Sequence, residues 1–327
     1  MFMKIIKKNK YSNFLKTLFQ IIIGFIIFYL IFSYFKKEIA SLDFNKIRGL
    51  FFSIGKIKFS IIIFLGIIGM SILSLYDFFV LRAVAMHKNL STSKIFKISF
   101  MTNSLNMILG FGGFIGASLR YYLYKPYSKN KKNLIVAIGM ILISMLSGIS
   151  LLSILVILGF LPGEDLYEKN ITLYYFLIAM SLFLPIYLFL NLRNPKLKSD
   201  RFLSVKLAII SFFEWIYAAF LVLFILFIFE GDFVIDKEFR IIGIIVISSI
   251  AGLITMIPGG AGTFDILVLI GLTRLGFNDE VVAATILIYR LSYYIVPFLI
   301  GLILLLFEIF TKFRKKIKYS RRDIYDS

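Results

Sequence analysis

Long apolar runs constrain this chain more than any other feature of its sequence. Runs of about 20 residues, the length that a helix needs to cross roughly 30 Å of hydrocarbon, occur at 14–35, 59–81, 134–161, 171–190, 205–229 and 281–307. Because 60% of the 327 residues are hydrophobic, too few polar residues remain to cover a soluble domain of this size. The sequence therefore predicts an all-α polytopic membrane protein with about six full spans, forming a single transmembrane domain over 1–327.

Two further apolar stretches, 98–124 and 241–276, are interrupted. The first is interrupted by Gly110, Gly112, Gly113 and Gly116. The second is interrupted by Pro258, Gly259, Gly260 and Gly262. A continuous helix would lose roughly 3 kcal/mol for the proline and roughly 1 kcal/mol for each glycine, so both helices are expected to break. Free backbone groups at membrane depth need protein or a water-filled cavity, and the break at 256–265 is therefore a candidate site.

The charge of the loops predicts their sidedness. Loops 82–97 and 125–133 contain basic residues and no acidic ones, so the positive-inside rule places both in the cytoplasm. The same rule places the basic N-terminus, loop 191–204 and the basic tail 311–327 in the cytoplasm, with loops 162–170 and 230–240 outside. Both interrupted stretches then begin and end on one side, which predicts two re-entrant hairpins of opposite sense.

Opposed hairpins between full spans are typical of an inverted-topology repeat with its site near the midplane. The predicted repeats are 59–161 and 205–307, although the sequence leaves open whether the hairpins cross as short spans instead. Loop 36–58 contradicts the charge rule, because it should be external yet is mainly basic. An amphipathic interfacial segment at about 41–52 is the suspected explanation.

Five charged residues lie inside or beside these apolar stretches, where each costs roughly 2.5 to 3.5 kcal/mol to insert. They are the predicted substrate-path residues Asp77, Arg120, Glu214, Asp265 and Arg290. Each also has a structural interpretation. Asp77 and Arg120 could snorkel or form an ion pair, Asp265 could cap the helix after Gly262, and Glu214 could pair with Arg290. The glycines could serve close helix packing alone.

The functional interpretation is an anion-binding path. A short helix starting near Gly262 would present backbone N–H groups to a phosphate. Arg290 and Arg120 would add charge-assisted hydrogen bonds, and the acids would hold the arginines or receive a cationic headgroup. Such a path suits a phospholipid head, with phenylalanine-rich walls for the acyl chains.

Other chemistries lack the residues they need. The chain has no cysteine and one histidine, His87, in a basic loop, so we expect no metal site, no cofactor and no catalytic residue set. The net charge of +19 comes from residues clustered at the ends of apolar runs. That pattern favours loops lying on anionic lipid over a nucleic-acid partner.

The motif PGGAGTFD at 258–265, followed by YRLSYY at 289–294 and Pro297, resembles a known family. It is similar to the transmembrane flippase domain of the multiple peptide resistance factor, also called lysylphosphatidylglycerol synthase or phosphatidylglycerol lysyltransferase. The stretch from GGFIG at 112–116 to RYY at 120–122, with Asp77 before it and Glu214 after, is similar to that domain as well.

The resemblance implies movement of aminoacylated phosphatidylglycerol to the outer leaflet, which raises resistance to cationic antimicrobial peptides. In this family the lysyl transfer from lysyl-tRNA belongs to a separate C-terminal domain. After Phe310 about 17 residues remain, which we expect to be too few for that domain.

The sequence thus predicts a lipid flippase of alternating-access type in the bacterial inner membrane, with the phospholipid as its partner. Three alternatives stay open: a phosphatidylglycerol lysyltransferase that acts with a separate synthase chain, a membrane scaffold whose buried charges serve assembly, and a carrier of small ions or amino acids. The identity of the lipid, the energy source and the formation of a homo-oligomer also stay open.

Overall fold

The computed structural model describes residues 43–84, 86, 90–109, 113–163, 166, 171–192 and 202–325, and within them every regular element is a helix. The first part contains α3 (Phe44–Ser53), α4 (Lys56–Ile72), α5 (Ser74–Ala83), α6 (Thr92–Leu109), α7 (Phe114–Tyr124), η3 (Lys125–Tyr127), α8 (Lys131–Ser144) and α9 (Ser147–Ile157). The second part contains α11 (Ile171–Ser181), α12 (Phe183–Leu192), α13 (Leu203–Glu230), η5 (Gly231–Val234), α14 (Glu238–Ile254), η6 (Pro258–Gly260), α15 (Thr263–Arg274), α16 (Asp279–Tyr289), η7 (Arg290–Ile295) and α17 (Val296–Tyr325).

Five helical segments of the described chain are long and apolar enough to cross a membrane. They are Lys56–Ala83, Lys131–Ile157, Ile171–Asn191, Leu203–Val234 and Asp279–Thr311. Each overlaps one of the predicted runs, whereas the predicted run 14–35 lies outside the described residues. The chain is therefore an all-α, multi-pass membrane protein, as its sequence predicted.

Four of these spans contain an irregularity that the apolar pattern did not predict. The helix is interrupted at Leu73, at 145–146 and at Leu182, and it widens to a π-helix in η7. At 145–146 and next to Leu182 a side chain of a neighbouring helix binds a backbone carbonyl that is freed. The carbonyl of Met145 accepts hydrogen bonds from Ser211 Oγ at 2.9 Å and Trp215 Nε1 at 3.0 Å, both on α13.

The second interrupted stretch breaks where the sequence predicts. The α-helix ends at Ile254 and resumes at Thr263, with only the short 3₁₀ turn η6 between. Gly259, Gly260 and Gly262 have φ angles of 63°, 61° and 83°, a region that favours glycine.

The first interrupted stretch also ends one helix and begins another, since α6 ends at Leu109 and α7 begins at Phe114. Gly113 precedes α7 with a φ of 85°, while Gly110 and Gly112 lie outside the described residues. Gly116 lies inside α7, so it does not break the helix. It instead lets α7 approach Asn106 on α6, whose Oδ1 accepts the Gly116 N–H at 2.9 Å.

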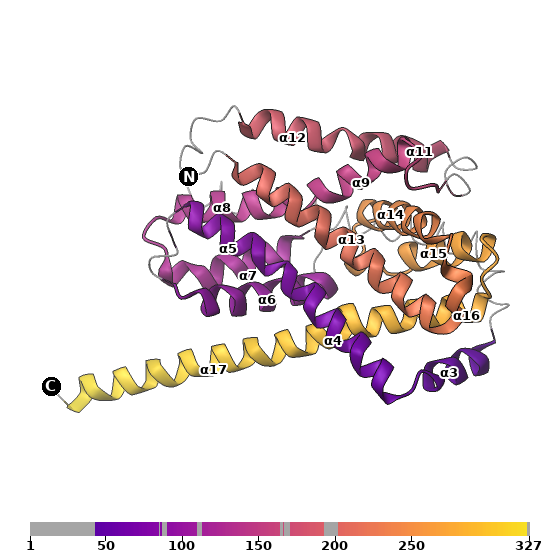
Figure 1. Ribbon diagram of the computed structural model, residues 1–327. Coiled ribbons are helices and arrows are strands. Elements are labelled where there is room, and N and C mark those ends of the chain that lie inside the picture. Colours follow the sequence, from indigo (N-terminus) through magenta and orange to yellow (C-terminus); the bar gives the residue numbers. More distant parts are fainter. Residues whose placement is uncertain are drawn as a thin grey trace, which may run out of the picture.

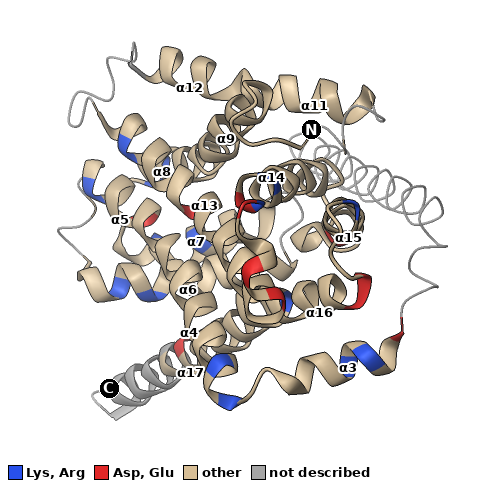
Figure 2. Cartoon of the chain, turned by 45° about the vertical axis from the view of Figure 1, so that its right-hand side comes forward, with Lys and Arg blue, Asp and Glu red and all other residues tan. Residues whose placement is uncertain are grey.

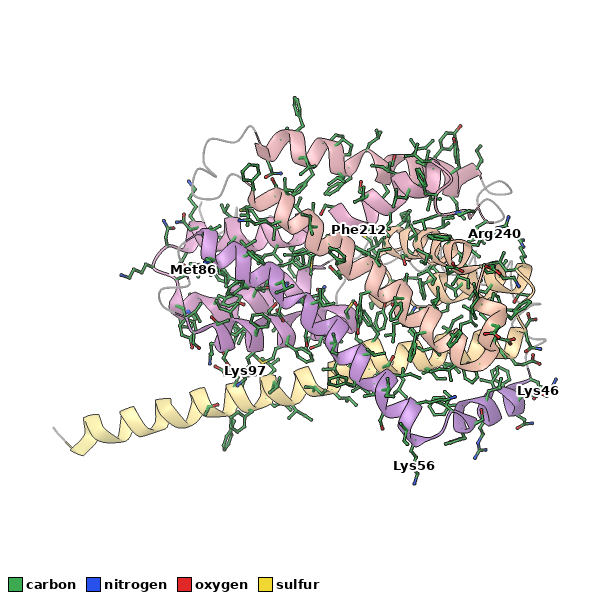
Figure 3. The ribbon with its side chains drawn as sticks, viewed as in Figure 1. Lys46, Lys56, Met86, Lys97, Phe212 and Arg240 are labelled. Atoms are coloured by element: carbon green, nitrogen blue, oxygen red, sulfur yellow. The ribbon has the colours of Figure 1, made fainter. Side chains whose placement is uncertain are left out.

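The helices divide the molecule between two ends (Figure 1). Helices α5 to α8 gather at one end and α14 to α16 at the other, while α4 and α13 run diagonally between the two groups. Figure 3 places Met86 near the first end, Arg240 near the second and Phe212 on α13 between them. Two clusters of buried apolar side chains follow this division, with α5 to α8 in one and α14 to α16 in the other.

Charge differs between the two ends (Figure 2). The ends of α5 to α8 and the turn before α8 form what we call the basic end, carrying Arg82, Lys94, Lys97, Lys125, Lys129, Lys131 and Lys132. The opposite end, which we call the mixed end, also carries the acidic residues Glu230, Asp232, Asp236, Glu238, Asp279 and Glu280.

The segment suspected at 41–52 contains a helix, α3, which lies at the mixed end. Asp43 begins it, because the Asp43 side chain accepts the N–H groups of Asn45 and Lys46 at 2.9 and 3.2 Å. Ile47 is buried against the molecule, whereas Phe44 and Phe52 are 70% and 72% exposed. Such a two-faced helix is suited to a membrane interface.

Candidate functional site

Arg290 and Asp265 form an ion pair beside the break between α14 and α15. Arg290 Nε donates to Asp265 Oδ1 at 2.8 Å, and Nη1 donates to the carbonyl oxygen of Gly259 at 2.5 Å. Nη2 lies 2.8 Å from the same Asp265 oxygen, as an ion-pair contact without hydrogen-bond geometry. The two side chains keep 15% and 27% of their surface exposed, so the pair is reachable from outside the packed interior.

Aromatic rings surround this arginine. Its guanidinium lies 4.7 Å from the ring centroid of Tyr294 and 5.3 Å from that of Phe264. Tyr294 and Tyr293 belong with Arg290 to the π-helix η7, and the Tyr293 ring stacks on that of Tyr289, the last residue of α16, with the ring centroids 5.5 Å apart. Ring faces attract a cation and exclude water from its flanks, so the guanidinium is held on several sides.

The break itself lies against the other interrupted stretch. A Cβ added at Gly259 would be 3.2 Å from the carbonyl oxygen of Met107, near the end of α6, and 3.0 Å from the Tyr294 ring. Helix α6 packs against η6. The end of α6 and the turn after α14 therefore meet at the Arg290 site.

Asp265 also caps α15. Its Oδ2 accepts the backbone N–H of Gly262 at 2.8 Å, which suits an acid in a first helical turn. Asp265 therefore caps α15 and pairs with Arg290 at the same time. The sequence predicts a phosphate-binding site at the start of α15. In the structure the Gly262 N–H at that position binds the Asp265 carboxylate instead.

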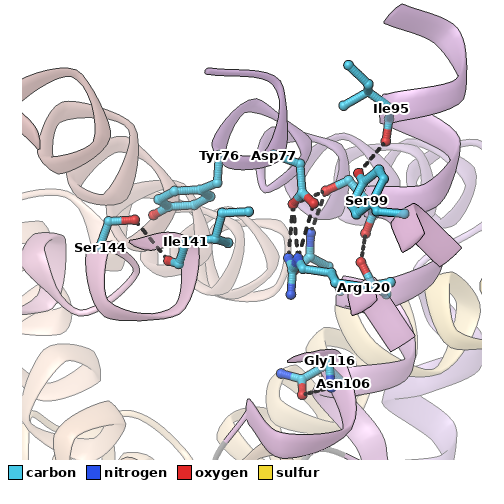
Figure 4. A network of polar contacts seen from close by, with 12 residues as sticks. Tyr76, Asp77, Ile95, Ser99, Asn106, Gly116, Arg120, Ile141 and Ser144 are labelled. Atoms are coloured by element: carbon cyan, nitrogen blue, oxygen red, sulfur yellow. Dashed lines mark hydrogen bonds and ion pairs between the residues drawn. The ribbon is translucent and has the colours of Figure 1, made fainter. Parts of the chain in front are cut away.

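Asp77 and Arg120 form a second ion pair, which is completely buried (Figure 4). Arg120 Nε lies 3.1 and 3.2 Å from the two carboxylate oxygens, and Nη2 donates to Asp77 Oδ2 at 3.1 Å and to Asn103 Oδ1 at 2.7 Å. Ser99 Oγ donates to Asp77 Oδ2 at 2.7 Å. Neither charged side chain has exposed surface. In this conformation the pair ties α5 to α6 and α7, and a ligand cannot reach it.

Glu214 is the remaining predicted residue, and it pairs with neither arginine. Tyr76 on α5 donates its hydroxyl to Glu214 Oε2 at 2.6 Å. Glu214 is 7% exposed, and within the described chain no lysine or arginine lies within ion-pair distance of it. The structural alternative in which Glu214 pairs with Arg290 is therefore not what the structure shows.

Residues 18–301 match the family described as the lysylphosphatidylglycerol synthase TM region. The chain belongs to this family. The resemblance seen in its helix-break motifs is thereby confirmed. The structure describes no metal-binding group of His, Cys, Asp or Glu within the residues it covers.

Two staphylococcal relatives carry the name phosphatidylglycerol lysyltransferase. The protein of Staphylococcus haemolyticus (strain JCSC1435) is 36% identical over 317 residues, which cover 96% of this chain and 36% of that protein. The protein of Staphylococcus aureus (strain MRSA252) is 36% identical over 314 residues, with the same two shares. The chain thus spans about a third of the length of the curated relatives that it matches.

The uncharged partners of Asp77 and Glu214 were not predicted from the sequence. Asn103 and Ser99 complete the Asp77 network, and Tyr76 binds Glu214. Polar residues four positions apart on α6 were a usable signal, because they share one helix face.

A third ion cluster, at the basic end, was also missed. Glu308 on α17 accepts hydrogen bonds from Lys94 at 2.9 and 3.1 Å and from Lys97 at 3.3 Å, both on α6. Partial burial lowers the pKa of Lys94, but the hydrogen bond and charge of Glu308 outweigh it and leave that pKa above its ordinary value. These ion pairs connect the first turns of α6 to α17.

Proposed function

We propose that the chain is a lipid flippase that moves aminoacylated phosphatidylglycerol, or a related phospholipid, between leaflets of the bacterial inner membrane. The observation that carries the proposal is the partly exposed Asp265–Arg290 pair at the meeting point of the two helix breaks. Ionisable residues within membrane segments are costly and mark pathways or partners. Of the two arginine pairs, Asp265–Arg290 is partly exposed and can be reached by a ligand in this conformation, whereas Asp77–Arg120 cannot.

An exchange of ion pairs would let this site take a headgroup. A phosphodiester approaching Arg290 competes with Asp265 for the guanidinium and can bind it through two parallel hydrogen bonds. The carboxylate that is released can then receive the ammonium group of the aminoacyl head. One internal pair is replaced by two pairs with the lipid, so neither Arg290 nor Asp265 is left unpaired at membrane depth.

The arrangement of the shorter helices supports alternating access. Helices α6 and α7 have their outer ends at the basic end, and α14 and α15 have theirs at the mixed end. We interpret them as re-entrant hairpins of an inverted repeat, with the basic end and both termini in the cytoplasm. Asp77, Arg120 and Glu214 would join the path only in conformations that open the packing around α5 and α7.

Outer-leaflet exposure in cells tests the proposal. A host that makes aminoacylated phosphatidylglycerol but lacks its own flippase would express the parent chain, and a membrane-impermeant amine reagent would measure the exposed lipid. The parent should raise the labelled fraction and Arg290→Ala should not. Arg240→Ala is the matched control, because Arg240 is an exposed arginine at the mixed end. Equal labelling with parent and with Arg290→Ala, at equal protein abundance, would contradict the proposal.

Lysyl transfer is the second candidate function, since the relatives carry the name phosphatidylglycerol lysyltransferase. Lipid extraction distinguishes lysyl transfer from lipid movement. If this chain alone produces lysylphosphatidylglycerol in a host that lacks the lipid, the chain is a transferase. If the lipid appears only when a separate synthase is supplied, the transferase assignment fails for this chain.

A further inference from the structure

Three acids are buried in the described chain, Asp77, Glu214 and Glu308, and Glu214 is the one of them that no cation binds. Asp77 and Asp265 are each bound by an arginine, and Glu308 is bound by two lysines. Glu214 lies near the middle of the long span Leu203–Val234 with no cation within ion-pair distance in the described part of the chain. A buried carboxylate without a counter-ion is costly unless it becomes neutral.

The groups that face Glu214 are phenols. Tyr76 from α5 donates at 2.6 Å, and Tyr293 from η7 interacts with it electrostatically. Tyr217, one turn further along α13, is bound elsewhere, because its hydroxyl donates to the carbonyl of Leu65 at 2.8 Å. Asp77, next to Tyr76, is neutralised by Arg120. The nearest cation on the same helix is Lys206, eight residues away in the sequence and about 12 Å along the axis.

Glu214 also lies at a junction between elements of both predicted repeats. Ser211 and Trp215, on the same stretch of α13, bind the free carbonyl of Met145 at the α8–α9 interruption. The Tyr76 bond reaches α5 from the same stretch of α13. Opening of the packing between α5 and α13 would therefore break the Tyr76 bond and expose Glu214 to water.

We propose that Glu214 is a proton-binding site whose occupancy is coupled to the transport cycle, so that the chain carries protons together with, or in exchange for, its lipid. This inference rests on the proposed transport function. In the closed packing the carboxyl group holds a proton and accepts the Tyr76 hydroxyl. When the junction opens to water at one face the proton leaves and a carboxylate remains. The step is the gain or loss of one proton, and no other bond forms or breaks.

Glu214→Gln is the informative substitution. The amide is nearly isosteric with the protonated acid, and its oxygen can still accept the Tyr76 hydroxyl, but it cannot release a proton. The variant should therefore fold as the parent does. Glu230→Gln, the same substitution at the end of the same helix, is the matched control.

The first measurement does not depend on transport. Infrared difference spectra of the purified protein, recorded as pH is changed near neutrality, where exposed Asp and Glu are already ionised, should contain a carbonyl band of a protonated carboxylic acid that titrates. The band should be present in the parent and in Glu230→Gln and absent in Glu214→Gln. An unchanged band in Glu214→Gln would overturn the proposal.

The second measurement uses liposomes with an imposed gradient of one pH unit and a clamped membrane potential, with lysylphosphatidylglycerol as the probe. One pH unit is a tenfold ratio of proton activity, so coupling to one proton shifts the steady-state ratio of lipid between leaflets by up to about tenfold. The parent should show this shift, and Glu214→Gln should leave the ratio unchanged. If the parent moves lipid but the gradient leaves its ratio unchanged, the proposed coupling to protons is wrong while the transport function stands. If the parent moves no lipid, the transport function fails and the infrared result alone decides whether Glu214 binds a proton.

Discussion

At the scale of single residues, the two arginine pairs differ in what surrounds them. Asp77 and Arg120 have no exposed surface, while Arg290 and Asp265 keep 15% and 27%. Removing one partner of a fully buried pair leaves an uncompensated charge, whereas water can compensate a partly exposed one. The first pair should therefore control folding more strongly, and the second should control function.

Asp77→Asn tests whether the fully buried pair controls folding. The substitution leaves Arg120 without its carboxylate and should cost about 3 to 5 kcal/mol of stability. The loss of stability is measured by heating the protein in detergent and determining by size-exclusion chromatography how much remains folded at each temperature. Asp265→Asn should shift the unfolding midpoint less. The reverse order would show that burial does not separate the roles of the two pairs.

The sequence identified these residues but not all of their pairings. Charges within apolar runs are visible in the sequence, because insertion into lipid is costly. Which acid meets which arginine depends on how α5, α7, α13, α15 and η7 pack. That packing brings Asp265 to Arg290 across 25 positions and leaves Glu214 with a phenol instead of a cation.

At the scale of elements, close approach between helices depends on glycine in α9. A Cβ at Gly148 would overlap the backbone of Ser211 on α13, and the Gly148 N–H donates to Ser211 Oγ at 2.8 Å. Small residues let membrane helices pack closely in this way. The contact holds α9 against the stretch of α13 that carries Glu214.

Gly148→Ala should separate these helices and cost about 1 to 3 kcal/mol or more, as overpacking does. Gly139→Ala is the control, because a Cβ there has nothing within 4 Å and alanine favours a helix by roughly 0.5 to 1 kcal/mol. Unfolding midpoints in detergent should therefore move in opposite directions for the two variants. A Gly148→Ala protein as stable as Gly139→Ala would show that the α9–α13 contact is loose.

The breaks in the helices were predictable where their cause is local. Proline and glycine at 258–262 act through the backbone itself, and the structure breaks there. The interruption at Leu182 also has a local cause, because Pro185 cannot donate to the Ser181 carbonyl, which Ser150 Oγ binds instead. The interruptions at Leu73 and 145–146 contain neither proline nor glycine, and at 145–146 side chains of α13 bind the freed carbonyl. A hydrogen bond from Trp215 to a distant carbonyl leaves no periodic signal in the sequence.

At the scale of the whole molecule, the distribution of charge predicts which end faces the cytoplasm. Because the sequence contains no cysteine, single cysteines can be added without removing any. Lys129→Cys, at the basic end, should react with an impermeant thiol reagent only after the inner membrane is opened. Asp232→Cys, at the mixed end, should react in intact spheroplasts. Reaction of both from the same side would overturn the assignment of the two ends.

The central claim is that the Asp265–Arg290 pair lies on a route for lipid headgroups. Headgroup movement in liposomes that contain the purified protein tests it most directly, with lysylphosphatidylglycerol and phosphatidylglycerol compared per folded molecule. We predict that the parent and Arg240→Ala move lipid and that Arg290→Ala, folded to the same extent, moves at least about tenfold less, the loss of roughly 1.4 kcal/mol or more at the barrier. Equal movement by the parent and by Arg290→Ala would contradict the account and leave the pair a structural feature of the helix break.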